Sequence, residues 1–295
     1  MGFVDYLVED ELSKAHNGLA VVLNSDVLFY YGPMAFETPH IFAEFIQKTD
    51  KKKQTLTIVL TTGGGMVEPV ERAVEIIRRH YRFVNFIVPD YAMSAGTVFC
   101  MSGDKIFMDQ ASSLGPIDPQ VQKSDGTLVP AMGYLEQLEK LIDKSIKKTI
   151  SPAEIDLLRR FDLGDINRYE QARNLTVTLL KKWLVTFKFK NWKIHKTTPA
   201  RKGHLVTDDE KICRAEEIAK KLGDISIWHS HGRHIGITTL KKELRLRIED
   251  YTNKKNISDQ IMIYNALATD YIRKNGYLLY VHSGSVIRAI AGGNR

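Results

Sequence analysis

Cysteine is scarce in this chain, which has only two among its 295 residues. Cys100 and Cys213 lie far apart in the sequence, and neither belongs to a Cys-x-x-Cys pair of the kind that zinc and redox sites use. We therefore expect two free thiols that pack inside the fold, and neither a zinc site nor another metal site.

Long apolar runs are also missing. No stretch approaches the roughly 18 uninterrupted apolar residues that a membrane-spanning helix needs. The opening residues 1–11 are acidic and lack the basic region and apolar core of a signal peptide. The sequence therefore predicts no membrane span and a cytoplasmic location. Its hydrophobic content of 43% is enough for a sizeable core.

Two nucleotide-binding motifs are absent as well. The glycine run 63–65 is followed by Met66 and Val67, whereas a phosphate-binding P-loop continues with Lys and then Ser or Thr. The dinucleotide pattern Gly-x-Gly-x-x-Gly does not occur. We therefore expect no cofactor.

The net charge of +7 comes visibly from basic clusters. They lie at residues 51–53, 188–202 and 241–247, and Phe189 and Trp192 interleave with the second cluster, as in single-strand nucleic-acid surfaces. No known nucleic-acid module accompanies them, so we interpret the clusters as solvated surface and do not expect a nucleic-acid partner.

Apolar runs of strand length alternate with stretches of helical periodicity through the first third of the chain. This order predicts right-handed crossovers in an α/β layered fold, whose functional groups collect beyond the carboxyl ends of the strands. The expected strands are 18–23, 27–31, 56–60, 83–88 and 105–108, the first two as a hairpin or strand pair; the expected helices begin near residues 40, 67 and 94.

The rest of the chain is predicted to be mainly helical. We expect a core with a helical arm over residues 1–190, and a basic linker with a mainly helical extension over 191–295 that packs on the core or on a neighbouring subunit. Expected helices cover 132–148, 152–160, 166–190, 207–221, 238–251 and 257–274, followed by a strand at 277–281.

Ser94 is the candidate nucleophile. It follows an apolar strand directly and begins a compact apolar run, so it sits at a helix N-terminus, where free N–H groups stabilise developing negative charge. The alternative is that Ser94 only caps this helix, as serine often does. The glycine turn lies one crossover away, at the same edge of the sheet, and this coincidence favours catalysis.

The glycine turn offers hydrogen-bond donors for an oxyanion. Gly64 has no Cβ, so its N–H can approach a substrate carbonyl, and Ala95 N–H at the helix start can provide a second bond. The alternative is that the run is a tight strand-to-helix turn and nothing more.

Four stretches in this order carry a resemblance: residues 61–64, 91–97, 104–108 and 114–120. Together they resemble the Clp-fold serine peptidases, specifically the serine dehydrogenase proteinases, relatives of signal peptide peptidase A. The resemblance implies a repeated β-β-α spiral of the Clp/crotonase type with a helical arm, and assembly into homo-oligomers. It is strongest over residues 18–120.

By this resemblance Ser94 would be the nucleophile, with Gly64 and Ala95 as the oxyanion donors. The substrate groove would include Gly63, Gly65 and the loop 114–120, with Gly115, Pro116, Asp118 and Pro119. His231 matches a histidine of the family and is kept as a site candidate. The three histidines within 229–234 do not have the spacing of a metal site.

The general base is the open question. Clp proteases place a histidine soon after the serine, but Ile117 and Asp118 stand there. Signal peptide peptidases use a lysine further along, sometimes from a neighbouring subunit, and the chain offers Lys140 and Lys144. Such a lysine must be partly desolvated to lose its proton near neutral pH. The alternative is that both lysines are solvated. Asp118 can orient a base or fix the proline loop.

The leading hypothesis is an ATP-independent serine peptidase that cleaves peptides or partly unfolded protein through a Ser94 acyl-enzyme, with a lysine as base. A second hypothesis is a non-catalytic oligomeric scaffold that keeps the Clp fold. A third is a crotonase-like enzyme, since that fold also aims two N–H groups at a thioester carbonyl.

Overall fold

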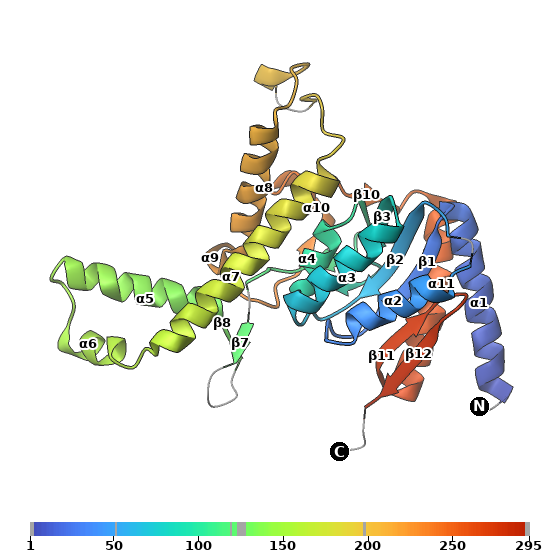
Figure 1. Ribbon diagram of the computed structural model, residues 1–295, viewed down its shortest axis with the longest axis horizontal. Helices are drawn as coiled ribbons and strands as arrows, with labels where there is room; N and C mark the ends of the chain where they lie inside the picture. The colour runs from blue at the N-terminus through green and yellow to red at the C-terminus, as the bar shows by residue number, and fades with distance from the viewer. Residues whose placement is uncertain (1–2, 51, 119, 123–127, 197–198, 293–295) are drawn as a thin grey trace.

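A computed structural model describes residues 3–50, 52–118, 120–122, 128–196 and 199–292 of the protein. A seven-stranded sheet forms its centre, in the order β10-β5-β3-β2-β1-β11-β12 (Figure 1). The strands from β10 to β1 run parallel, whereas β11 and β12 are antiparallel to their neighbours. Their bounds are β1 Asp26–Tyr31, β2 Thr55–Thr61, β3 Phe83–Ile87, β5 Lys105–Met108, β10 Glu249–Asp250, β11 Tyr277–His282 and β12 Ile287–Ala291.

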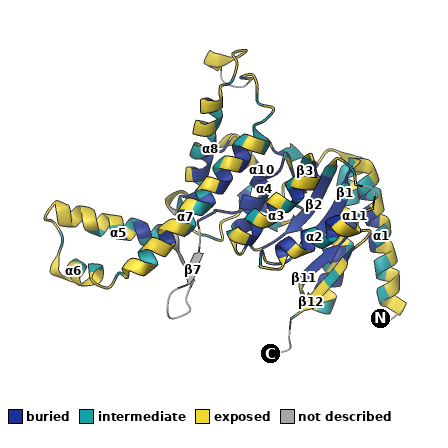
Figure 2. Cartoon of the chain, in the orientation of Figure 1, coloured by how far each residue is buried: buried dark blue, intermediate teal, exposed yellow. Residues whose placement is uncertain are grey.

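Helices cover both faces of this sheet. The side chains of each strand alternate between the two faces, and both faces are apolar and have to be buried. In β1, Leu28 and Tyr30 pack with α2, α3 and α4, whereas Val27 and Phe29 pack with α1 and α11. The helices are α1 Phe3–Leu23, α2 Thr38–Lys48, α3 Val67–His80, α4 Ala95–Met101 and α11 Lys255–Asn275. The result is a three-layer α/β fold whose central strands are buried, as Figure 2 shows. Strands buried on both faces have continuous apolar runs in their sequence.

A helical arm projects from one end of the sheet (Figure 1). It consists of α5 Ala131–Ile146, α6 Pro152–Leu158 and the first turns of α7 Leu163–Trp183. A π-helical turn at Leu184–Lys188 and α8 Asp208–Gly223 follow, with 3-10 turn Pro199–Arg201 between them, and α9 Ile225–Trp228 comes next. Capping boxes start α6 at Ser151 and α8 at Thr207, where each cap side chain accepts from the N–H three residues on.

Three short strands form a second sheet in the order β4-β6-β9. They are β4 Tyr91–Ala92, β6 Ser113–Leu114 and β9 Ile235–Gly236. β6 runs parallel to β4 and antiparallel to β9, so a segment from late in the chain lies close to the residues after strand β3. A hairpin of β7 Gln120–Gln122 and β8 Leu128–Pro130 connects this part to the arm.

Most predicted elements are confirmed, and two are wrong. Residues 18–23 end a long helix, α1, although their composition is typical of a strand. The helical spacing of Leu12, Ala15 and Leu19 decides this, because these three side chains are buried against α11. The predicted helix 238–251 is only α10 Ile237–Lys242, since the chain must then extend to pair β10 with β5. Strand β12 was not predicted.

Strands from both predicted parts of the chain join in one sheet, since β11 pairs with β1 and β10 with β5. The division at residue 190 stays a prediction. None of the described helices is both long enough and apolar enough to cross a bilayer. Cys100 and Cys213 are free thiols, as expected, but only Cys100 is buried.

Candidate active site

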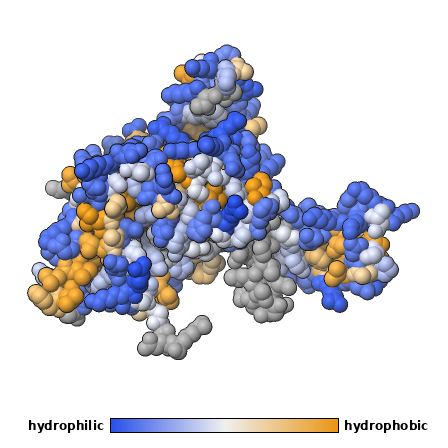
Figure 3. All heavy atoms as spheres, turned by 180° about the vertical axis from the view of Figure 1, so that it is seen from behind, coloured by the Kyte–Doolittle hydropathy of each residue, from blue (hydrophilic) through white to orange (hydrophobic). Residues whose placement is uncertain are grey.

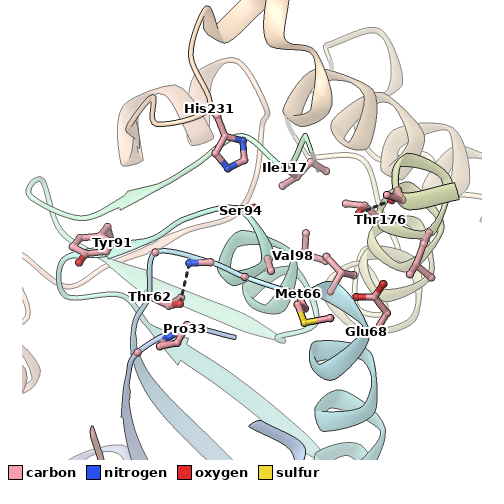
Figure 4. A pocket seen from close by; sticks show the side chains of 18 of the residues that line it. Pro33, Thr62, Met66, Glu68, Tyr91, Ser94, Val98, Ile117, Thr176 and His231 are labelled. Atoms are coloured by element: carbon pink, nitrogen blue, oxygen red, sulfur yellow. Dashed lines mark hydrogen bonds between the residues drawn. The ribbon is translucent and has the colours of Figure 1, made fainter. Parts of the chain in front are cut away.

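A cavity of about 800 Å³ opens where β1, β2 and β4 end (Figure 4). This is the edge at which ligands bind in α/β sheets. The cavity contains Ser94, the glycine turn and His231, and α7 closes one side. Its further lining residues are Tyr31, Gly32, Pro33, Thr61, Thr62, Met66, Val67, Glu68, Tyr91, Ala95, Val98, Ile117, Arg168, Ala172, Leu175, Thr176 and Leu278.

Ser94 occupies a sharp turn between β4 and α4. Its backbone has φ 52° and ψ −118°, a conformation that non-glycine residues rarely adopt and that costs about 1–3 kcal/mol. Its side chain makes no capping hydrogen bond to α4, although Ser94 stands at the N-cap position. The same kind of strained strand-to-helix turn exposes the nucleophilic serine of α/β hydrolases.

The surrounding backbone holds this turn in place. Thr62 N–H donates to Tyr91 O at 3.0 Å, and Met93 N–H donates to Thr62 O at 2.9 Å. The turn is also tight on its inner side, where a Cβ on Gly96 would lie 2.3 Å from Cγ2 of Thr62. These contacts compensate for the strained backbone of Ser94 and orient it toward the cavity.

The glycine turn abuts Ser94 directly. Gly64 has φ +102°, and a Cβ placed on it would lie 2.7 Å from Cβ of Ser94 and 3.4 Å from its Oγ. Only glycine allows this approach. The N–H of Gly64 donates to Oγ1 of Thr62 at 3.0 Å, so it already has an acceptor. Ala95 N–H has no hydrogen-bond acceptor among the described residues.

His231 and Asp118 form a hydrogen-bonded pair beside this cavity. Nδ1 of His231 lies 2.9 Å from Oδ1 of Asp118, whose side chain is fully buried. A carboxylate can only accept, so Nδ1 is the donor and Nε2 is left as the acceptor. Figure 4 shows the His231 ring on the wall of the cavity, pointing toward the turn that carries Ser94.

The small sheet explains why these residues meet. β4 leads into Ser94, β6 leads into Asp118, and β9 follows His231. His234 strengthens the β6–β9 contact through a 2.6 Å hydrogen bond between its Nδ1 and Oγ of Ser113. No hydrogen bond joins Ser94 to His231, although both are described residues; unliganded active sites often lack this contact.

The lysine candidates lie elsewhere. Lys140 and Lys144 are exposed on α5 and do not line the cavity, and Nζ of Lys144 pairs with Glu154 at 2.5 Å. Within one copy of the chain, the structure therefore does not bring either lysine to Ser94. The predicted role of Lys140 or Lys144 requires a second copy.

The structure places the predicted substrate residues in three different positions. Gly63 and Gly65 line the cavity with His231, whereas Asp118 lines a neighbouring groove. Gly115 and Pro116 are buried behind the cavity wall, where Gly115 N–H donates to Oγ1 of Thr97 at 2.9 Å. Pro119 lies outside the described residues.

No cluster of three or more histidine, cysteine, aspartate or glutamate side chains in the described ranges has an arrangement suited to a metal ion. His229 is exposed, and His231 and His234 are engaged with Asp118 and Ser113. Sequence reasoning missed the contribution of α7, whose Ala172, Leu175 and Thr176 line the cavity. The sequence predicts a helix over 166–190, but it does not indicate that one face of this helix lies against the glycine turn and Ser94.

A three-layer α/β fold with a strained serine at a strand-to-helix turn defines a hydrolase-like class of protein. Residues 37–191, more than half of the chain, match the family described as ClpP-like SDH-type serine proteinase. The chain belongs to this family of serine peptidases, which confirms both the resemblance and the predicted fold class.

Among individual proteins, two from Methanocaldococcus jannaschii are similar. Uncharacterized protein MJ0137 is 33% identical over 105 residues, which are 35% of this chain and 35% of that protein. Uncharacterized protein MJ1495 is 29% identical over 130 residues, or 41% of this chain and 44% of that protein. The matches thus span less than half of either relative.

Among solved structures, a variant of the 1510-N membrane-bound stomatin-specific protease in complex with a substrate peptide is similar at a TM-score of 0.44. It shares 13% sequence identity, over 90% of this chain and 84% of that chain.

Proposed function

We propose that the protein hydrolyses peptide bonds through an acyl-enzyme on Ser94. The observation that carries this proposal is the backbone of Ser94, held at φ 52° beside a glycine turn and at the edge of a cavity. A structural cap would not need such a conformation, since a serine N-cap ordinarily has an extended backbone and bonds to its helix. Strain of this kind is concentrated at functional sites.

We further propose His231 as the general base, with Asp118 as the residue that positions it. Support comes from the 2.9 Å contact between Nδ1 and Oδ1, which leaves Nε2 with a free lone pair on the cavity side. A buried carboxylate also stabilises the imidazolium that forms when Nε2 takes a proton. A lysine base from the arm of a second copy is the alternative.

The chemical steps follow from these roles. Oγ of Ser94 attacks the carbonyl carbon of the scissile bond while Nε2 of His231 takes the hydroxyl proton. The imidazolium then returns this proton to the leaving amine as the C–N bond breaks, and an ester on Ser94 remains. Water attacks the ester with His231 again as base, which releases the carboxylic acid and restores the serine.

The oxyanion is assigned to Ala95 N–H and the glycine turn. Ala95 N–H is the first donor of α4 and benefits from the positive end of that helix. Gly64 N–H can serve only if the substrate oxygen displaces or shares the hydrogen bond to Thr62. The orientation of the Thr62 hydroxyl is therefore expected to affect the rate of acylation, because it decides whether Gly64 N–H is available to the oxyanion.

The substrate is proposed to be a peptide or a partly unfolded protein, cleaved without ATP in the cytoplasm by a homo-oligomer. Exposed apolar side chains on the arm support assembly, since Ile146 is 75% exposed and Leu157 is 52% exposed. Figure 3 shows apolar atoms gathered on this projection, and a second copy would cover them.

Labelling with a fluorophosphonate tests the nucleophile. Wild-type protein should react once per chain at Ser94, and the Ser94→Ala variant should not react. Labelling that persists in the variant would refute the proposal. Absence of both labelling and peptidase activity in the wild-type protein would favour a scaffold that keeps only the fold. Binding of coenzyme A in calorimetry, without any labelling, would instead support the crotonase-like alternative.

A further inference from the structure

A second groove of about 480 Å³ lies on the arm side of the cavity. It runs between α5, α7 and α8, and it shares Ile117 and Thr176 with the first cavity. In Figure 4 both shared residues lie on the side of the cavity where α7 passes. The two spaces therefore adjoin, and the groove lies close to where the residues that flank a scissile bond at Ser94 would lie.

The wall between the two spaces carries an unsatisfied acceptor. Oδ1 of Asp118 accepts from His231, but its Oδ2 is buried and has no hydrogen-bond partner among the residues that the structure describes. Asp118 lines the second groove. A buried carboxylate that is only partly compensated adds negative potential to the groove beside it, which favours a positive charge there.

Acidic groups outnumber basic ones in the groove. Glu136 and Glu139 lie on α5, one turn apart, and no ion pair is found for either of them within the described ranges. Asp224 adds a further carboxylate near the end of α8, although its Oδ1 already accepts from Ser226. These carboxylates favour a cationic side chain in the groove.

The basic groups are fewer and less available. Lys220 lies on the rim and pairs with Glu216 at 3.9 Å, so its charge is partly compensated. Arg173 directs its Nε to Asn174 at 3.5 Å. The floor between the charges is apolar, with Leu135, Val177 and Ala219. A lysine or arginine of a substrate suits this combination, because its aliphatic stem can lie on the floor while its charge reaches the two glutamates.

We propose that this groove is a specificity subsite, and that it binds a lysine or arginine of the polypeptide substrate on one side of the scissile bond. Glu136 and Glu139 are the residues that select the cation. This inference rests on the proposed peptidase function, because it assumes that a chain lies across Ser94. It extends that function by naming the class of substrate.

Binding to an inactive variant tests the subsite apart from catalysis. The Ser94→Ala chain is incubated with a peptide library cut only after glutamate, so that internal Lys and Arg residues survive. Retained peptides should carry Lys or Arg at one fixed position. The best peptide and its norleucine analogue are then compared by fluorescence polarisation, and the lysine peptide should bind about tenfold more tightly, as expected for one ion pair of about 1.4 kcal/mol.

The double change Glu136→Gln and Glu139→Gln should remove this tenfold preference while leaving the norleucine peptide within twofold. Glu170→Gln is the matched control, since Glu170 is exposed on α7 and does not line the groove. The charge-reversed double variant Glu136→Lys and Glu139→Lys should prefer a glutamate at the same position.

Two outcomes separate this inference from the proposed function. Equal binding of the lysine and norleucine peptides, or a preference that survives the double change, overturns the subsite even when the fluorophosphonate labels Ser94. Absence of labelling in the wild-type protein overturns the peptidase proposal, whereas the charge preference of the groove can still be measured in the binding assay.

Discussion

Nδ1 of His231 lies 2.9 Å from Oδ1 of Asp118, although the two residues are 113 positions apart in the chain. The antiparallel pairing of β6 with β9 brings them together, with Leu114 opposite Ile235. The contact fixes the tautomer of the imidazole, so that Nε2 can accept a proton at the cavity. A residue from the late part of the chain thereby lines the same cavity as Ser94 and the glycine turn from the early part.

The first prediction concerns the base. His231→Ala should lower kcat/KM for peptide hydrolysis by about 10²–10⁴-fold, because a positioned base contributes this much. His229→Ala is the matched control, since His229 is exposed in the same segment and should retain activity. Retained activity in His231→Ala, together with its loss in Lys140→Ala or Lys144→Ala, would assign the base to the arm of another copy.

The second prediction concerns the positioning residue. Asp118→Asn keeps the size of the side chain but removes the charge that stabilises the imidazolium and can reverse the tautomer. We expect a large loss in kcat and a shifted pH–rate profile for Ser94 labelling, with circular dichroism unchanged. A purely structural role for Asp118 would lower stability and leave the pH profile as in the wild type.

The third prediction concerns the glycine turn. Gly64→Ala should abolish labelling of Ser94, since its Cβ would lie 2.7 Å from Cβ of Ser94 at a backbone φ of +102°. Gly203→Ala serves as a control for backbone strain alone, because Gly203 has φ +89° with nothing within 4 Å of its added Cβ. Both variants should lose some stability in urea titrations, but only Gly64→Ala should lose reactivity.

The fourth prediction concerns stability at low pH. Burial and the neighbouring His16 lower the pKa of His282 to about 3, from 6.5. Its other neighbours are Tyr264, whose hydroxyl lies 2.7 Å from Nδ1, and the stacked ring of Tyr280. The folded protein thus keeps His282 neutral, whereas the unfolded chain protonates it below about pH 6.5.

Because the pKa of His282 is lower in the folded protein than in the unfolded chain, the free energy of unfolding decreases as the pH falls. The contribution of His282 to stability is complete above pH 6.5 and falls by about 1.4 kcal/mol for each pH unit below it, down to the folded pKa. Urea unfolding at pH 7, 6 and 5 should show a flatter dependence for His282→Phe than for the wild type. The exposed His40→Phe should keep the wild-type slope. Parallel slopes for all three proteins would contradict this prediction.

The fifth prediction concerns a buried ion pair at the edge of the sheet opposite the cavity. Arg78 Nη1 lies 2.8 Å from Oδ2 of Asp104, with exposed fractions of 11% and 9%. Burial raises the pKa of Asp104, but hydrogen bonds from Lys190, Val84 N–H and Arg78 outweigh this effect and lower it. Asp104→Asn should lower the free energy of unfolding by about 3 kcal/mol, because Arg78 would remain buried without its counter-charge. An unchanged urea midpoint would count against the pair as a stabilising contact.

Much of the site could be predicted because the glycine run 63–65 and Ser94 lie close together in the sequence and are each recognised from the residues next to them. The glycine run and Ser94 each follow an apolar strand, and carboxyl ends of neighbouring parallel strands meet at one edge. The sequence also indicated the arm and most helix starts, since capping residues such as Ser151 and Thr207 act within one turn.

What the sequence determined by itself was therefore the alternation of strands and helices, the candidate nucleophile and the family resemblance, all of which rest on short-range periodicity and ordered motifs. Residues 18–23 were assigned to α1 only in the tertiary structure, because the surface of α11 that buries Leu19 comes from the far end of the chain. Only the tertiary structure shows that Asp118 is hydrogen-bonded to His231 and that the backbone of Ser94 has a positive φ. These features depend on contacts across many positions, whose geometry no local pattern encodes.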